Sequence, residues 1–140
     1  MKHNTQDLQN LLNISVRHVR RQGEPSLNSK GHCVYRGPGG LQCAAGPFIR
    51  CYTRAMDRAD INFHALAEKY PNRILPSARR NEHFVSNVLQ PAHDMATRDA
   101  RQDFMTEYHL GLAQRLRSYK DITGIQLSIP PPIAMGARTY

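Results

Sequence analysis

The chain has 140 residues, a mass of 15.9 kDa and a net charge of +8, and 40% of its residues are hydrophobic. This length is that of one ordinary domain, and it suffices for folding without a metal ion or a disulfide. No apolar run approaches the ~20 residues that span a bilayer, and the polar start lacks the apolar core of a secretory signal. We therefore expect a soluble, cytoplasmic protein with a single domain over residues 1–140.

The positive charge is concentrated in the first part of the chain. Residues 1–52 hold seven basic and two acidic side chains, whereas basic and acidic residues are nearly balanced in the rest. Most of the basic residues are arginine, whose planar guanidinium makes paired hydrogen bonds to phosphate or carboxylate. Such a charge fits nucleic acid, an acidic protein surface or an anionic ligand. The alternative is that the charge only keeps the protein soluble.

The cysteines give no sign of a disulfide framework or a structural zinc site. There are three of them, Cys33, Cys43 and Cys51, an odd number without a close pair. Structural zinc sites commonly offer two cysteines about two to four residues apart, and this sequence has no such spacing. We therefore predict no bound metal and no cofactor, and interpret the thiols as small apolar residues in or near a core.

The spacing of apolar residues predicts an amphipathic helix over residues 5–22. Leu8, Leu12 and Val19 belong to a row of apolar residues at three- and four-residue steps, which places them on one face. Gly23 follows and should end the helix. The last turn gathers three cations that complement the helix dipole. They are Arg17, Arg20 and Arg21.

Residues 24–50 lose this helical period. The segment begins with Pro, Ser, Asn and Gly, which are typical of a loop. Residues 32–36 and 41–44 then flank the glycine-rich residues 37–40, which predicts a short β-hairpin. A two-stranded hairpin is marginal in water, so we expect it to lie against helices. The glycine-rich stretch lacks the pattern of a phosphate-binding loop and is interpreted as a turn.

Three further helices are predicted in the remainder of the chain. The apolar stripe of residues 52–70 is the most regular. A helix over about residues 80–97 contains Pro91, which should kink or divide it near Gln90. The last helix covers about residues 99–120, with acidic residues at its start and basic residues at its end, as the helix dipole favours.

The tail over residues 121–140 is predicted to be irregular, with an optional edge strand at residues 126–129. Three prolines follow and favour an extended polyproline conformation. The elements together predict an α+β domain of about four helices with one small hairpin packed on them. The expected core residues are Leu8, Leu12, Val19, Phe63, Leu66, Phe84, Val88, Phe104, Tyr108 and Leu112.

Two sets of residues are candidates for chemistry. Cys33 with His93 and Asp94 has the residue types of a small enzyme or nucleotide-binding site with a thiol nucleophile. Neighbouring side chains on a helix point about 100° apart, so we expect that His93 and Asp94 do not share a ligand. Tyr35 and Arg36 combine an aromatic ring with a guanidinium, which suits base stacking with phosphate contact or a protein interface.

Two segments resemble the motifs of a known group of proteins. They read GHCVYRGPGGLQCAAG over residues 31–46 and LQPAHD over residues 89–94. A Cys-x-Tyr-Arg strand, a glycine-rich turn and Cys-Ala-x-Gly, followed later by Leu-Gln and His-Asp, is similar to the signature of small bacteriophage and prophage proteins without assigned function. The resemblance covers about residues 31–50 and 84–95. It implies a phage origin, and small phage proteins often bind and disable a host complex.

Charge and resemblance together suggest a non-enzymatic, phage-encoded interaction protein in the host cytoplasm. It would bind and inhibit a host complex, such as a bacterial defence system, through a basic, arginine-rich face. A direct nucleic-acid-binding protein is the alternative, and a small enzyme using Cys33, His93 and Asp94 is a weaker one. The partner and the oligomeric state stay open. The residues expected to bind the partner are Arg17, Arg20, Arg21, Lys30, Tyr35, Arg36 and Arg50.

Overall fold

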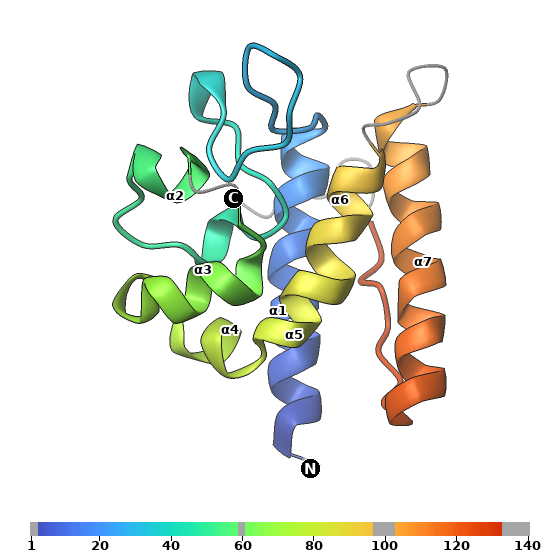
Figure 1. Ribbon diagram of the computed structural model, residues 1–140. Coiled ribbons are helices and arrows are strands. Elements are labelled where there is room, and N and C mark those ends of the chain that lie inside the picture. The colour runs from blue at the N-terminus through green and yellow to red at the C-terminus, as the bar shows by residue number, and fades with distance from the viewer. Residues whose placement is uncertain (1–2, 59–60, 97–102, 133–140) are drawn as a thin grey trace.

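The computed structural model describes residues 3–58, 61–96 and 103–132, and this part of the chain is mostly helical (Figure 1). The described residues contain no β-strand or sheet, so the predicted α+β class is wrong. None of the described helices is long and apolar enough to cross a membrane. The α-helices are α1 (His3–Gln22), α2 (Arg54–Arg58), α3 (Phe63–Lys69), α4 (Pro76–Arg80), α5 (Glu82–Phe84), α6 (Gln90–Ala96) and α7 (Phe104–Thr123). The shorter turns are the 3₁₀ helices η1 (Pro38–Gly40), η2 (Gly46–Phe48) and η3 (Pro71–Arg73), and the π-helical η4 (Val85–Leu89).

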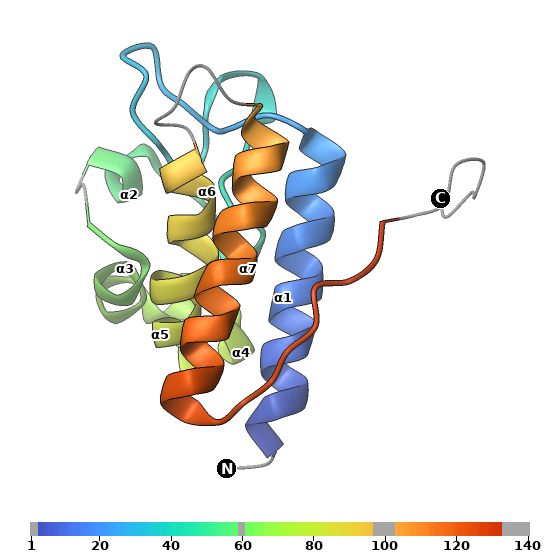
Figure 2. The same cartoon turned by 90° about the vertical axis from the view of Figure 1, so that its right-hand side faces the viewer.

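The helices form two groups around one core. Helices α1, α6 and α7 lie side by side, and α2, α3 and α4 lie beside them (Figures 1 and 2). The connection between α1 and α2, residues 23–53, runs across one end of both groups (Figure 1). The largest fully buried side chains come from both groups and from this connection. They include Tyr108, Phe48, Phe63, Phe84, Leu11 and Met56.

The predicted first helix and its buried face are confirmed. Leu8, Leu12 and Val19 on α1 are each at most 3% exposed. Gly23 has a φ of +73°, a left-handed conformation that glycine adopts easily, and its N–H donates to the Val19 carbonyl at 2.8 Å. The other predicted core residues are also buried, except Phe104, which is partly buried against the core.

The predicted β-hairpin does not form, although its whole segment is described. Arg36 and Gln42 make a single antiparallel bridge around the glycine-rich turn, and the pairing does not extend into strands. A helix side chain takes an amide that a longer hairpin would need: the Asp57 carboxylate accepts from Tyr35 N–H at 2.7 Å, and it also accepts from the neighbouring Arg36 N–H at 3.3 Å. Residues 43–45 are buried in succession, whereas a half-exposed strand buries every second residue.

The segment predicted as one helix over residues 52–70 is divided into α2 and α3. Asn62 is the N-cap of α3, and its side-chain oxygen accepts from Ala65 N–H at 2.9 Å. An N-cap has extended backbone geometry, so a helix cannot continue through it. Met56 and Phe63 are both buried on either side of the division, which explains why the apolar stripe predicted a single helix.

Pro91 disturbs its helix near Gln90, as predicted, without ending it. The π-helical turn η4 leads directly into α6, and Gln90 N–H donates to the carbonyl of Val85 five residues earlier. Proline lacks an N–H and its ring would collide with a carbonyl of the preceding α-helical turn. The wider π turn gives the ring room and rotates the residues that follow.

The tail after α7 folds back across α1 (Figure 2). Gly124, with a φ of +77°, ends α7. Residues 126–129 pair with no strand in the described part of the chain, so the optional edge strand is also wrong. Instead the Gln9 side chain donates to the Ser128 carbonyl at 2.7 Å and accepts from Ser128 N–H at 3.0 Å. Residues 133–140 lie outside the described residues.

Gly46 is required by close packing at the start of η2. A Cβ atom at this position would lie 2.6 Å from Gln42 Cβ and 3.1 Å from the Tyr35 carbonyl oxygen. We expect Gly46→Ala to lower the free energy of unfolding by about 1–3 kcal/mol, measured by urea denaturation. The matched control is Gly111→Ala in α7, where a Cβ meets nothing within 4 Å. This substitution should raise the free energy of unfolding by about 0.5–1 kcal/mol. Equal effects of the two substitutions would contradict this packing.

His18 should make the fold weaker in mild acid. Burial lowers the pKa of His18 below 6.5, and the charge of Arg21 adds to this, while the hydrogen bond of Nε2 to the Gln42 carbonyl at 3.0 Å opposes it. The folded protein thus binds this proton less tightly than the unfolded chain, so stability is present above pH 6.5 and falls as the pH drops toward the lowered pKa. We expect His18→Gln to flatten the fall of unfolding free energy between about pH 7.5 and pH 5. Identical pH profiles for the two proteins would show that His18 does not contribute.

Candidate functional site

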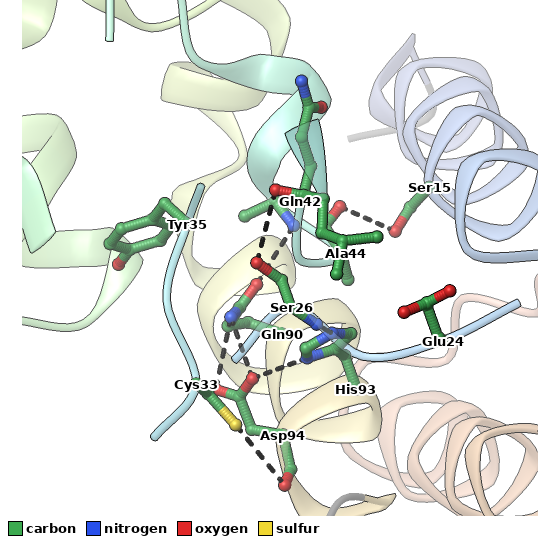
Figure 3. A network of polar contacts seen from close by, with 12 residues as sticks. Ser15, Glu24, Ser26, Cys33, Tyr35, Gln42, Ala44, Gln90, His93 and Asp94 are labelled. Carbon is green, nitrogen blue, oxygen red and sulfur yellow. Dashed lines mark hydrogen bonds and ion pairs between the residues drawn. The ribbon is translucent and has the colours of Figure 1, made fainter. Parts of the chain in front are cut away.

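The two segments that carry the resemblance meet in space (Figure 3). Gln90, His93 and Asp94 on α6 face the connection between α1 and α2. Ala45 N–H donates to Gln90 Oε1 at 3.0 Å, and Ser26 N–H donates to His93 Nε2 at 3.2 Å. Gln90 Nε2 in turn donates to both carboxylate oxygens of Asp94, at 3.1 and 3.2 Å. The helix side chains therefore hold the irregular connection by its backbone.

The hydrogen bonds of His93 assign its tautomer. The ring is fully buried, and Nε2 accepts the backbone N–H of Ser26, so Nε2 carries no proton. The proton of the neutral ring is then on Nδ1, which lies 2.8 Å from Asp94 Oδ1 and donates to it. Both ring nitrogens are thus engaged inside the protein.

Cys33 lies next to this pair. The thiol, an imidazole nitrogen of His93 and a carboxylate oxygen of Asp94 all lie within 4.8 Å of one another. The His93 and Asp94 side chains contact each other, because the 100° angle applies to the Cα–Cβ bonds and the side chains turn toward each other beyond Cβ. A metal ion or a thiol proton would need a lone pair on His93, and Ser26 N–H already occupies the one on Nε2. The cluster fits a structural network better than a metal centre or a Cys–His catalytic pair.

A cavity of about 360 Å³ adjoins the cluster between the connection, α3 and α6. Asp94, whose side chain is 33% exposed, reaches its wall. The cavity wall also includes Cys33, Tyr35, Asn62, Ser86 and Met95.

Cys43, the second cysteine of the region, has an unreactive thiol. Burial, with a further contribution from the Asp94 charge, raises the pKa of Cys43 to about 12.

A second hollow of about 580 Å³ lies between α2 and the connection, and we call it the arginine cleft. Its wall includes three arginines, Arg36, Arg54 and Arg58. Within the described residues none of the three lies within 4 Å of a carboxylate, as an ion pair requires. The described remainder of its wall consists of Asn28, Ser29, Val34, Gly37, Pro38, Tyr52 and Asp57.

Asp57 is the acidic group of the described cleft wall, and its oxygens are already used. The carboxylate accepts from the backbone N–H groups of Tyr35 and Arg36 and from the Tyr52 hydroxyl. Burial, together with the hydrogen bond to Asp57, raises the pKa of Tyr52 to about 12, so the hydroxyl keeps its proton. The Arg36 guanidinium lies over the Tyr52 ring, 5.3 Å from its centre, and donates to the Ile49 carbonyl at 3.4 Å. Asp57 thus fixes the cleft wall and offers little to neutralise it.

The residues predicted to bind a partner do not all lie at the surface of the structure. Arg17, Arg21, Lys30 and Arg50 are exposed. Arg20 instead holds the fold together, because its guanidinium donates to His109 Nε2 at 3.1 Å and to the Pro130 carbonyl at 2.7 Å.

Tyr35 and Arg36, adjacent in the sequence, have different surroundings. Tyr35 is only 7% exposed, and its hydroxyl donates to the Ile61 carbonyl at 2.8 Å. Its ring therefore has no face open to a base. Arg36 is half-buried in the wall of the arginine cleft.

Sequence reasoning missed Arg54 and Arg58. They are four residues apart, and this spacing on a helix was a usable signal for a shared face. The segment was instead interpreted through its apolar stripe. The approach of Arg36 to the same hollow depends on the path of the connection, and no local pattern in the sequence specifies that path.

Comparison of the chain with models of protein families, with curated proteins and with solved structures finds no match. The arrangement of the residues alone therefore carries the functional argument.

If His93 stabilises the fold, its replacement should lower the free energy of unfolding. We expect His93→Ala to lower the free energy of unfolding by about 2–4 kcal/mol, because it leaves a buried hole and an unpaired Ser26 N–H. The control is His32→Ala, an exposed histidine on the connection, which should change stability by less than about 0.5 kcal/mol.

The tautomer of His93 can be observed directly. Long-range ¹H–¹⁵N correlations of the ring should show a neutral imidazole with its proton on Nδ1. A proton on Nε2 would rule out the hydrogen bond from Ser26 and would reopen the catalytic interpretation.

Proposed function

We propose that this chain is a non-enzymatic interaction protein whose arginine cleft binds an acidic segment of a partner protein. The observation that carries the proposal is the set of guanidinium groups of Arg36, Arg54 and Arg58 around one hollow without a carboxylate at ion-pair distance among the described residues. Guanidinium groups bind carboxylates with two parallel hydrogen bonds. A hollow lined in this way fits the side chains of glutamate and aspartate.

The state of Arg36 supports the same proposal. Its Nε is buried and has no hydrogen-bond partner among the described residues. A buried donor without an acceptor costs free energy, so the fold leaves the hydrogen-bonding capacity of Arg36 incompletely used. Asp57 and Tyr52 hold the Arg36 side chain and backbone in place, so little ordering is needed on binding.

An acidic protein segment fits the cleft better than nucleic acid does. Binding of single strands relies on aromatic faces on which bases stack, each worth about 1–3 kcal/mol. Tyr35 is buried, and Arg36 covers the Tyr52 ring. Of the aromatic residues beside the cleft, Tyr35 is therefore closed to stacking, and one face of the Tyr52 ring is already taken by Arg36.

The resemblance to small phage proteins suggests the setting of this interaction. We propose a host complex as the partner, with inhibition of that complex, such as a bacterial defence system, as the result. Occupied ring nitrogens on His93 support a non-enzymatic role, because they make His93 a poor proton acceptor for the Cys33 thiol.

The experiment compares two charge reversals of the same size. Arg54→Glu/Arg58→Glu reverses the cleft, and Arg17→Glu/Arg21→Glu reverses two exposed arginines with the same four-residue spacing on α1. Binding of a fluorescent ten-residue glutamate peptide is measured for both variants and for the original chain. We expect the cleft variant to bind at least about 10-fold more weakly, which corresponds to about 1.4 kcal/mol, and the α1 variant to bind within about 3-fold of the original.

Two outcomes contradict the proposal. Equal loss in both variants would mean that net charge and not the cleft attracts the peptide. Tighter binding of single- or double-stranded DNA than of the peptide, with affinity falling about 10³-fold between roughly 50 and 200 mM salt, would favour nucleic acid instead. Capture from nuclease-treated bacterial lysate, with the original chain and the two variants as baits, then shows whether the binding of a partner protein depends on the cleft.

A further inference from the structure

A second cluster of ionisable side chains lies away from both hollows, where α3 meets α5. His64 comes from α3, and Glu82 and His83 come from α5. His64 Nδ1 lies 2.7 Å from Glu82 Oε1, and the rings of His64 and His83 stack with centroids 4.8 Å apart. One potential ligand atom from each of the three residues falls within 4.8 Å of the others.

The donor set fits zinc. Two imidazoles and one carboxylate are the ligands of many zinc sites that keep a fourth position for water. Ligand atoms around a tetrahedral Zn²⁺, with bonds of about 2.1 Å, lie about 3.4 Å apart, so small rotations suffice to reach this geometry. His83 is exposed, so its ring can rotate with little disturbance of the core.

The outer contact of His64 also matches a metal ligand. A histidine that binds a metal usually donates the N–H of its other nitrogen to a carboxylate or a carbonyl, which fixes the tautomer. His64 Nε2 lies 3.2 Å from Glu68 Oε1, one helical turn further along α3. With its proton on Nε2, the ring presents the lone pair of Nδ1 toward Glu82 and His83.

The Nδ1 atom of His64 supports the metal site independently of the distances between the ligand atoms. It is buried and has no hydrogen-bond partner of suitable geometry among the described residues, although Glu82 Oε1 lies only 2.7 Å away. A nitrogen lone pair and a carboxylate oxygen at this distance repel each other unless a cation lies between or beside them. An added proton or a metal ion would remove this repulsion.

The contrast with His93 shows why this cluster is the better metal site. The outer nitrogen of His93 receives a backbone N–H from Ser26, which leaves the proton on the nitrogen that faces Asp94. The outer nitrogen of His64 faces the carboxylate of Glu68, which leaves the inner nitrogen available. The two clusters have similar residue types, but only the His93 ring has a nitrogen lone pair occupied by a backbone N–H.

We propose that His64, Glu82 and His83 bind a Zn²⁺ ion, with Glu68 as the carboxylate that orients His64. The ion joins α3 to α5 and leaves one coordination position open to water or to a ligand from a partner. Binding requires neutral imidazoles, so zinc affinity falls as the pH drops through the range in which histidine gains its proton.

The test is zinc titration of the untagged full chain by isothermal calorimetry, with thermal unfolding as a second readout. We expect one Zn²⁺ per chain and a higher melting temperature with zinc but not with Mg²⁺, which prefers oxygen ligands. His83→Ala removes an exposed ligand and should weaken zinc binding at least about 10-fold. It should also abolish the zinc-dependent rise in melting temperature.

Two control variants identify the site. His32→Ala removes an exposed histidine elsewhere, and Cys33→Ser removes the thiol of the other cluster. Both should bind zinc within about 3-fold of the original chain. The proposal is overturned if the original chain takes up no stoichiometric zinc, if His83→Ala binds as tightly as the original, or if Cys33→Ser is the variant that loses the ion.

Discussion

The fold depends on helix side chains that satisfy the backbone of a long connection without strands. Between α1 and α2 the chain must bury residues such as those at 43–45 while its peptide groups lack a ladder of partners. Gln22, at the end of α1, donates to the carbonyl of Gln42 at 2.8 Å and accepts its N–H at 2.8 Å, as a neighbouring strand would. Asp57 and Gln90 serve other amides of the connection in the same way. A buried peptide group left unpaired would cost about 1–3 kcal/mol, so these few side chains determine the path of the connection.

The same contacts give the candidate sites their character. The Asp57 carboxylate accepts hydrogen bonds from the backbone, and within the described residues the arginines beside it have no carboxylate at ion-pair distance. Both ring nitrogens of His93 make hydrogen bonds in the interior, so His93 is poorly suited to exchange a proton with Cys33. Among the buried side-chain nitrogens of the described residues, Arg36 Nε in the cleft and Nδ1 of His64 have no hydrogen-bond partner. The two proposed sites therefore rest on polar groups whose hydrogen-bonding capacity the described fold leaves unused.

The sequence predicted the parts of the structure that local periodicity determines. α1, its buried face and its end at Gly23 follow from apolar spacing and one glycine, and the disturbance at Pro91 follows from a missing N–H. The hairpin was wrong because the pattern around the glycine-rich turn cannot show that Asp57, about twenty residues later, takes its amides. The approach of Arg36 to Arg54 could not be predicted for the same reason, since it depends on pairings between distant residues.

The pairing of Gln9 with Ser128 has a consequence for the order in which the molecule can be completed during synthesis. These residues are 119 positions apart, and Arg20 likewise finds its Pro130 partner 110 positions later. A ribosome adds about 5–20 residues each second, so α1 waits on the order of ten seconds for the segment that covers it. During that interval Gln9 and Arg20 lack these partners, whereas the apolar face of α1 can already pack against η2, α4 and η4. The side of α1 that the tail crosses is therefore among the last parts of the described fold to be covered.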